Sequence, residues 1–194
     1  MSSPAADEAE SAADALRRLV VDVPDFPEPG VVFKDITPVL ADPRAFATVV
    51  EALADAGRDD AGRPLVDHVA GMEARGFILA APVALSLGAG FVPVRKQGKL
   101  PRETVAESYA LEYGEATLEV QRDALQPGAR VLLVDDVLAT GGTVAATRRL
   151  VERCGAVAVG VAVLMDLSFL PGREAIGDLP LTSLMTVGAR RARP

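Results

Sequence analysis

Apolar residues along the chain follow two patterns, short continuous runs and helical repeats. Continuous runs, typical of strands buried on both faces of a sheet, occupy residues 68–72, 91–94, 131–134 and 157–164. Helical spacing appears at residues 12–20, 43–56, 77–87 and 143–154, and more alternating strands are expected near residues 109–113 and 118–120. Because helices separate the buried strands, we expect βαβ crossovers and an α/β fold with a parallel sheet.

The pattern also suggests where the folded part begins. Residues 1–11 consist of Met, Ser, Pro, Ala and acids without apolar periodicity, so we expect a disordered lead-in. Asp42 followed by Pro43 is a typical helix start, with an N-cap and a proline at the first helical position. We find no internal repeat or linker, and 194 residues suit about one domain, so residues 12–194 are expected to form a single domain.

The most informative segment, residues 131–143, reads VLLVDDVLATGGT. Its apolar run places Asp135 and Asp136 at the carboxyl end of a buried strand, the edge at which open α/β sheets bind ligands. Gly141 and Gly142 permit close backbone approach, and Thr143 opens a helical repeat. Successive amides and the positive end of a helix would then meet at one point, which favours an anion.

The two acids restrict what this anion is. Carboxylates would repel a bare phosphate, so the ligand should carry hydroxyl groups or a cation between phosphate and acids. A ribose 5-phosphate fits, with its 2- and 3-hydroxyls donating to Asp135 and Asp136. Two acids alone would also fit an ordinary capped turn, but the attached glycine loop favours a binding site. The candidate ribose 5-phosphate site comprises Asp135, Asp136, Ala139, Thr140, Gly141, Gly142 and Thr143.

Composition excludes several classes of protein. The net charge of -7 argues against nonspecific nucleic-acid binding. The single cysteine, Cys154, cannot form an internal disulfide and fits a reducing compartment. The longest apolar stretch, residues 156–165, is far shorter than the roughly 20 residues of a membrane span. The start also lacks the basic region of a signal peptide. We therefore expect a soluble cytoplasmic protein without membrane partners.

The DD-xxATGGT signature resembles the phosphoribosyl pyrophosphate motif of the type I phosphoribosyltransferases. Residues 26–40, 71–77 and 95–114 further resemble the members of that family that act on adenine, and the resemblance covers residues 24–170. It implies a parallel-sheet α/β fold with helices on both faces and a small hood from the N-terminal segment and a loop. It also implies a pentosyltransferase of purine salvage that converts adenine and 5-phospho-α-D-ribose 1-diphosphate into AMP and pyrophosphate.

The segment GMEARGF, residues 71–77, has the glycine spacing of a P-loop, but Phe77 stands where that motif requires lysine. By resemblance it is instead the pyrophosphate-binding loop, formed by Glu73, Ala74, Arg75 and Gly76. Arg75 would add a cation near the reacting centre and count as catalytic. The alternative is that Arg75 forms an ordinary surface ion pair.

The segment RKQGKLPR, residues 95–102, concentrates positive charge directly after a predicted strand. A solvated charge run is the alternative, but its position and its Gly and Pro suit a mobile loop that holds a polyanion. By resemblance Arg95, Lys96 and Lys99 bind pyrophosphate. Family members often have Pro where this chain has Gln97, which should change loop stiffness more than chemistry.

Residues 101–106 are polar and are expected to form a lid, which would protect a cation-like ribosyl group from water. The following LEYG segment resembles the family segment that places Glu112 and Tyr113 near the incoming base. We assign Glu112 as the catalytic group that handles the proton of the attacking ring nitrogen, and Tyr113 to the lid. A surface acid on an edge strand is the alternative for Glu112.

Base recognition is assigned by resemblance to the segment FPEPGVVFKD. Phe33 would stack on the purine, with Val137 opposite, and backbone groups of Val32 and Lys34 would read the edge of adenine. The VVF run could also be core. Val137 replaces the more usual Leu, and its smaller side chain should leave the base pocket slightly looser.

The resemblance implies Mg²⁺ as cofactor, carried by the diphosphate rather than by a dedicated protein site, and a homodimer. His68 is the only histidine, which gives a His-based metal site little support. Two alternatives remain. A relative that acts on hypoxanthine, guanine or orotate should lack the FPEPGVVF and LEYG segments. A nucleotide-sensing regulator would need a nucleic-acid reader, and the roughly 25 residues before FPEPG are too few and too acidic for one.

Overall fold

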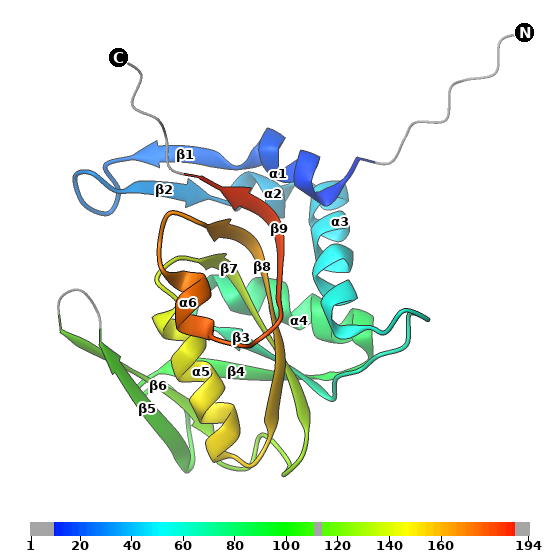
Figure 1. Ribbon diagram of the computed structural model, residues 1–194, viewed down its shortest axis with the longest axis vertical. Helices are drawn as coiled ribbons and strands as arrows, with labels where there is room; N and C mark the ends of the chain where they lie inside the picture. Colours follow the sequence, from blue (N-terminus) through cyan, green and yellow to red (C-terminus); the bar gives the residue numbers. More distant parts are fainter. Residues whose placement is uncertain (1–9, 111–113, 189–194) are drawn as a thin grey trace, which may run out of the picture. The chain divides into compact units, whose positions relative to one another are not determined.

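The computed structural model describes residues 10–110 and 114–188, and the chain divides into two compact units, residues 1–49 and 50–194 (Figure 1). Residues 1–9 of the expected lead-in lie outside the described residues. Glu10 and Ser11, its last two residues, are placed: Ser11 accepts a hydrogen bond from the amide of Asp14, and Glu10 pairs with Arg18. The expectation of one domain over residues 12–194 stays a prediction.

The first unit contains α1 (Ala12–Leu19), β1 (Val21–Pro24), β2 (Val32–Asp35), α2 (Thr37–Ala41) and the start of α3 (Pro43–Ala54). Strands β1 and β2 pair in antiparallel fashion. The predicted cap at Asp42 is confirmed, because its Oδ1 accepts hydrogen bonds of 3.0 Å from the amides of Arg44 and Ala45.

The second unit is built on a sheet with the strand order β5-β6-β4-β3-β7-β8-β9. Its parallel part consists of β3 (His68–Met72), β4 (Gly90–Lys96), β7 (Arg130–Leu138), β8 (Val157–Leu167) and β9 (Leu181–Val187). A hairpin of β5 (Thr104–Ala110) and β6 (Glu115–Gln121) adds to the β4 edge in antiparallel orientation. The predicted parallel α/β sheet is therefore confirmed, with an antiparallel hairpin added to one edge.

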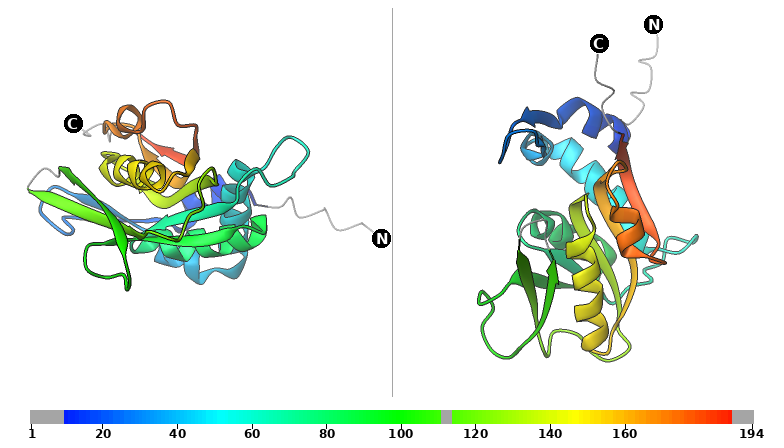
Figure 2. Two further views of the ribbon diagram at one scale, coloured as in Figure 1. Left: turned by 90° about the horizontal axis from the view of Figure 1, so that it is seen from below. Right: turned by 60° about the vertical axis from the view of Figure 1, so that its left-hand side comes forward.

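Helices α4 (Arg75–Leu87) and α5 (Gly142–Arg153) lie on opposite faces of this sheet (Figure 2). Two short helices, η1 (Asp55–Gly57) and α6 (Gly172–Ile176), complete the unit among the described residues. None of the helices in residues 10–110 and 114–188 is long and apolar enough to cross a membrane.

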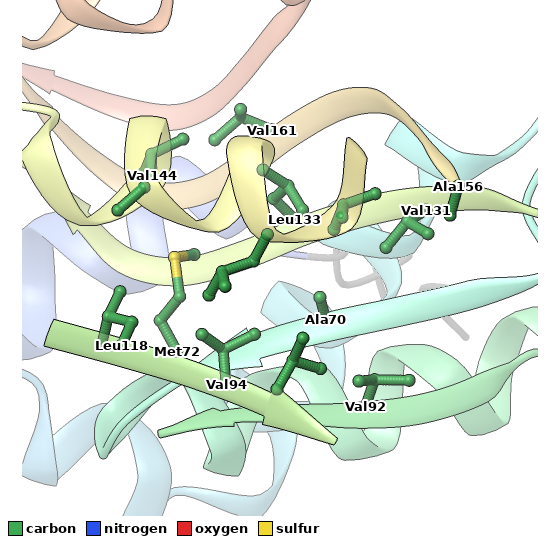
Figure 3. Packing of buried hydrophobic residues seen from close by; sticks show 14 of the residues in the cluster. Ala70, Met72, Val92, Val94, Leu118, Val131, Leu133, Val144, Ala156 and Val161 are labelled. Atoms are coloured by element: carbon green, nitrogen blue, oxygen red, sulfur yellow. The ribbon is translucent and has the colours of Figure 1, made fainter. Parts of the chain in front are cut away.

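The continuous apolar run on β7 is buried as predicted. Val131 and Leu133 pack in one cluster with Val144 and Leu150 of α5, as Figure 3 shows for part of this cluster. Their neighbours Leu132 and Val134, which alternate to the other face, are fully buried as well. Burial on both faces fixes β7 in the sheet and so fixes the position of the two acids, which lie within the strand directly after the apolar run.

Several boundaries differ from expectation by one to three residues, and two further differences bear on the site. Strand β7 continues to Leu138, because residues beyond Val134 still pair with β8. Residues 101–106, expected to form a lid, supply the first part of β5 from Thr104 onward, where pairing with β6 begins at Gln121. A polar stretch can be a strand when the partner strand satisfies its backbone groups.

Candidate active site

The two acids of β7 point to different sides of the strand and have different surroundings. Asp135 is half-buried and lines a small pocket. Asp136 is only 4% exposed, and its Oδ2 lies 2.9 Å from Nε of Arg75. One acid thus faces the ligand pocket while the other is held in an ion pair.

Burial raises the pKa of Asp135 well above its usual value, and the neighbouring charge of Asp136 raises it further. The amide of Asp136 donates a 2.9 Å hydrogen bond to Oδ1 of Asp135, which partly opposes this. The ionised form of Asp135 is therefore costly in the protein alone, and hydroxyl donors or a cation in the pocket would relieve that cost.

The pocket has a volume of about 70 Å³ and is lined by Asp135, Val137, Leu138, Ala139, Thr140, Gly141, Thr143 and Val144. We call residues 139–143 the phosphate loop. α5 starts at Gly142, so the first amides of that helix, which have no partner within it, lie at the pocket. Five of the predicted ribose 5-phosphate residues, Asp135, Ala139, Thr140, Gly141 and Thr143, therefore line one pocket at the start of α5; Asp136 and Gly142 are not among its lining residues.

Gly141 and α6 fit closely together. Gly141 has a φ of +80°, and a Cβ there would lie 2.6 Å from Cβ of Ala175 and 2.8 Å from the carbonyl oxygen of Gly172. A Cβ on Gly172 would in turn collide with the carbonyl of Ala139. The phosphate loop therefore has its shape set by backbone packed against backbone.

An ion pair fixes α6 beside this loop. Nε of Arg173 donates to Oδ2 of Asp166 at 2.7 Å, and Asp166, near the end of β8, is 1% exposed. Sequence reasoning missed both residues and Gly172. The available signal was an acid directly after the apolar run 156–165, just as Asp135 and Asp136 directly follow the apolar run 131–134.

The first turn of α4 meets β7 beside the two acids. A Cβ on Gly76 would lie 2.9 Å from the carbonyl oxygen of Val134 and 3.0 Å from Oδ1 of Asp135. The peptide bond between Glu73 and Ala74 is cis. The structure thus brings the GMEARGF segment and the two acids, 60 residues apart in the chain, to one edge of the sheet.

Glu73 contacts the positively charged segment 95–99, which we call the cation loop. Its carboxylate lies 2.5 Å from Nζ of Lys99 and 3.3 Å from Nε of Arg95, and it accepts a 3.0 Å hydrogen bond from the amide of Lys96. The hydrogen bond from Lys99 is the main reason that the pKa of Glu73 lies below its usual value. Three of the residues predicted to bind pyrophosphate, Arg95, Lys96 and Lys99, therefore contact Glu73, whereas Arg75 pairs with Asp136.

A second acid shapes the cation loop. Oε2 of Glu119 on β6 accepts a 3.0 Å hydrogen bond from the amide of Gly98, and Glu119 is 7% exposed. Gly98 has a φ of +78° and open space around it. Sequence reasoning did not identify Glu119, because an acid on an alternating strand is normally a surface residue.

The remaining predicted site residues are placed as follows. Val32, Phe33 and Lys34 lie on β2 of the first unit. The ring centroids of Phe33 and Phe26 lie 5.1 Å apart in a T-shaped arrangement, and Nζ of Lys34 lies 2.5 Å from Oδ1 of Asp22. Glu112 and Tyr113 lie outside the described residues. Their predicted roles, and those of β2, are not tested by this geometry.

Comparison with known proteins gives a consistent result. The family model of the phosphoribosyl transferase domain matches residues 37–171. An adenine phosphoribosyltransferase from Nocardioides sp. is 68% identical over 180 residues, which are 93% of this chain and 97% of that protein. One from Thermobifida fusca is 59% identical over 174 residues, covering 88% and 94% of the two chains.

Solved structures agree. The crystal structure of adenine phosphoribosyltransferase from Thermoanaerobacter pseudethanolicus superposes with a TM-score of 0.85 at 46% identity, covering 90% of this chain and 99% of that one. The Saccharomyces cerevisiae enzyme, crystallised with an imino-altritol bisphosphate and adenine, gives 0.84 at 37% identity, covering 89% and 98%.

Proposed function

This chain belongs to the phosphoribosyltransferase family, and from that membership we propose that it is the enzyme that transfers ribose 5-phosphate from phosphoribosyl pyrophosphate to adenine. A ring nitrogen of adenine bonds to the anomeric carbon, the bond from that carbon to the diphosphate oxygen breaks with inversion, and the proton of the nitrogen is lost. The products are AMP and pyrophosphate.

One observation carries this proposal: a phosphate-sized pocket at a helix N-terminus adjoins a carboxylate pair, and the second acid pairs with Arg75 of the neighbouring loop. Phosphate, sugar hydroxyls and diphosphate are the three polar parts of phosphoribosyl pyrophosphate. The relatives named above support adenine as the acceptor.

The phosphate loop would hold the 5-phosphate through its amides and the hydroxyl groups of Thr140 and Thr143. Asp135 and Asp136 would accept hydrogen bonds from the two ribose hydroxyls. For Asp136 this requires its present partner, Arg75, to turn toward the diphosphate. Because Gly76 lies close to β7, the hydroxyl contact of Asp136 and the turn of Arg75 toward the diphosphate would take place side by side.

The diphosphate would be bound by the amides at Ala74 and Gly76 and by the cations Arg75, Arg95, Lys96 and Lys99. Glu73 keeps the cation loop assembled before substrate arrives, so fewer side chains must be ordered on binding. Its carboxylate already accepts hydrogen bonds from three donors, which makes it an organiser of cations rather than a metal ligand.

Adenine recognition by Val32, Phe33, Lys34 and Val137, proton handling by Glu112 and cover by Tyr113 rest on the family resemblance. The aromatic face of Phe33 suits a purine, and a carboxylate suits proton transfer from a ring nitrogen. A folded Glu112→Gln variant should lose most of its turnover while retaining affinity for phosphoribosyl pyrophosphate; unchanged turnover would contradict this role.

Magnesium is part of the proposal. We propose that Mg²⁺ arrives on the diphosphate rather than at a dedicated protein site, since the ion is commonly held by substrate phosphates with one or two carboxylates. Bound with the diphosphate, the ion would neutralise charge on the leaving group. The chain's own residues supply the remaining positive charge from Arg75 and the cation loop.

We also propose a homodimer in the cytoplasm. Supporting a protein interface, Ile78 and Leu85 of α4 lie seven residues apart on the same side of the helix and are 45% and 83% exposed. Size-exclusion chromatography with light scattering would measure the mass directly, and a monomer at micromolar concentration would contradict the proposal.

The test of function is pyrophosphate release with phosphoribosyl pyrophosphate and Mg²⁺, comparing adenine with hypoxanthine, guanine and orotate. We expect turnover with adenine alone. Turnover with another base would keep the phosphate assignments and overturn those of Phe33 and Val137. Binding of phosphoribosyl pyrophosphate without turnover of any base would instead favour a regulator on this fold.

A further inference from the structure

Strand β5 of the hairpin is docked along α5. Oε1 of Glu107 accepts a 2.6 Å hydrogen bond from Nε of Arg149, and its Oε2 lies 3.1 Å from Nη1 of Arg153. Arg153 also donates to the carbonyl of Ala106. These contacts hold β5 against the middle and end of α5, the helix whose beginning forms part of the phosphate pocket.

Tyr109, two residues along the same side of β5, contacts the beginning of α5. Its half-buried ring packs against the core cluster, and a Cβ on Gly142 would lie 3.0 Å from its Cδ2. Its hydroxyl oxygen lies 3.2 Å from Oγ1 of Thr143. A side chain from the hairpin therefore reaches the hydroxyl group of a residue that lines the pocket.

The direction of this hydrogen bond follows from what the pocket binds. A threonine hydroxyl has one proton and two lone pairs. An ionised phosphate only accepts, so a Thr143 hydroxyl in contact with the proposed 5-phosphate would give its proton to the ligand. The hydrogen bond with Tyr109 can then exist in one sense only, with the tyrosine O–H donating to Oγ1 of Thr143.

We propose that Tyr109 is a positioning residue of the phosphate site, which donates to Thr143 and so directs the threonine proton toward the bound 5-phosphate. The proposal rests on the function proposed above. Tyr109 does not touch the ligand in this scheme. It selects the Thr143 rotamer and proton direction that a phosphate needs, and it makes the docked hairpin part of the phosphate site.

Tyr109→Phe is the direct test, because it keeps the ring that packs on Gly142 and removes only the donor. We expect ribose 5-phosphate, measured by titration calorimetry, to bind about tenfold more weakly. In turnover assays KM for phosphoribosyl pyrophosphate should rise by a similar factor, with kcat and KM for adenine changed less than about twofold.

Ser108→Ala is the matched control. It removes a hydroxyl from the adjacent residue of β5, where Ser108 pairs with Thr117 at 2.8 Å on the other side of the strand. We expect its affinity for ribose 5-phosphate to equal that of the wild type. Equal weakening by both variants would show that the hairpin acts through stability alone and would overturn the proposal.

A double-mutant cycle supplies a second test. With Thr143→Val the tyrosine proton has no acceptor at this position, so adding Tyr109→Phe should cost less than about twofold. Additive losses would overturn the proposal, as would unchanged affinity of Tyr109→Phe when the wild type binds. If the wild type itself does not bind ribose 5-phosphate, the proposed function fails first and this inference fails with it.

Discussion

The phosphate loop and the cation loop bind parts of the same proposed substrate but are built in different ways. The phosphate loop is shaped by backbone: Gly141 and Gly172 allow α6 and the loop to touch without side chains between them. The cation loop is shaped by charge, with long side chains gathered around Glu73 and with open space around Gly98. Rigid packing is the constraint in one region and charge balance in the other.

The acids of the two regions show the same contrast. Burial, followed by the charge of Asp136, raises the pKa of Asp135. A hydrogen bond from Lys99 lowers the pKa of Glu73. Asp135 is therefore an acid whose charge is opposed by burial and by Asp136 despite the hydrogen bond from the Asp136 amide, whereas the charge of Glu73 is stabilised by three donors. The proposed ligand would donate hydrogen bonds to Asp135 in the first region. In the second region its diphosphate would compete with Glu73 for Lys99 and Arg95.

The largest effect should come from Gly141→Ala. Its Cβ would collide with Ala175 and the backbone of Gly172 at a left-handed φ, so the loop must move. We expect kcat/KM for phosphoribosyl pyrophosphate to fall about 100-fold and the unfolding free energy to fall by about 2 kcal/mol. Gly98→Ala, at a similar φ but in open space, is the control and should cost clearly less in both assays. Equal losses in the two variants would show that the phosphate loop is not more tightly packed than the cation loop.

A smaller effect is expected from Glu73→Gln, because a neutral amide cannot hold Lys99 and Arg95 together. We expect kcat/KM to fall about tenfold. Because the folded pKa of Glu73 lies below the ordinary 4.5, the stability it contributes is present above pH 4.5 and is lost as the pH falls toward the folded pKa.

Melting curves of wild type and Glu73→Gln from neutral to acidic pH measure that stability. The variant should melt lower near neutral pH, and the two curves should converge below pH 4.5. A difference that stays constant with pH would mean that the loop is held by packing rather than by charge.

Asp135→Asn should change stability in the opposite direction. The folded pKa is raised, so the stability linked to Asp135 is present below pH 3.8 and is lost as the pH rises through the folded pKa. A neutral Asn avoids that loss, and we expect its Tm near pH 8 to exceed that of the wild type by about 2–4 °C. The gain should shrink on acidification; a destabilised variant at pH 8 would show that the carboxylate is well satisfied without ligand.

The smallest effect is expected from Val137→Leu. Val137 lines the pocket from β7, and its side chain, rather than the backbone, would contact the proposed adenine. One added methylene group should lower KM for adenine by about threefold or less, with KM for phosphoribosyl pyrophosphate unchanged. The two KM values, measured separately, check this. A large rise in KM for phosphoribosyl pyrophosphate would instead place Val137 with the rigid loop.

Sequence patterns predicted the interior of the fold well because burial on both faces leaves a strong signal. β3 has the predicted bounds, and α5 begins within one residue of the predicted helix. Strands β1, β2 and β9 and helices α2 and α6 were missed. All but β9 have only four or five residues, and β1 and β2 flank a turn rich in Pro and Gly, so these runs are too short to establish a period. β9 has seven residues, but its Thr and Ser residues do not alternate strictly with its apolar ones.

The residues of the candidate site could likewise be predicted only in part. Asp135, Arg75 and Lys99 could be identified because their residue types and their places after strands point to anion binding. Glu119, Asp166 and Tyr109 could not, because each acts through a partner distant in sequence: Gly98, the short helix α6 and Thr143 respectively. Such support becomes visible only when the strands are placed side by side.

In the ion pair between Arg75 and Asp136, Arg75 contacts a carboxylate where the proposal gives it the diphosphate. Asp136 contacts a guanidinium where the proposal gives it a ribose hydroxyl. A molecule that carries both diphosphate and ribose hydroxyls replaces both halves of the pair at once. Pyrophosphate alone would draw Arg75 away and leave Asp136, 4% exposed, as a buried charge without its cation. The intact substrate should therefore bind more tightly than its separate fragments combined, and loss of one product should weaken the hold on the other.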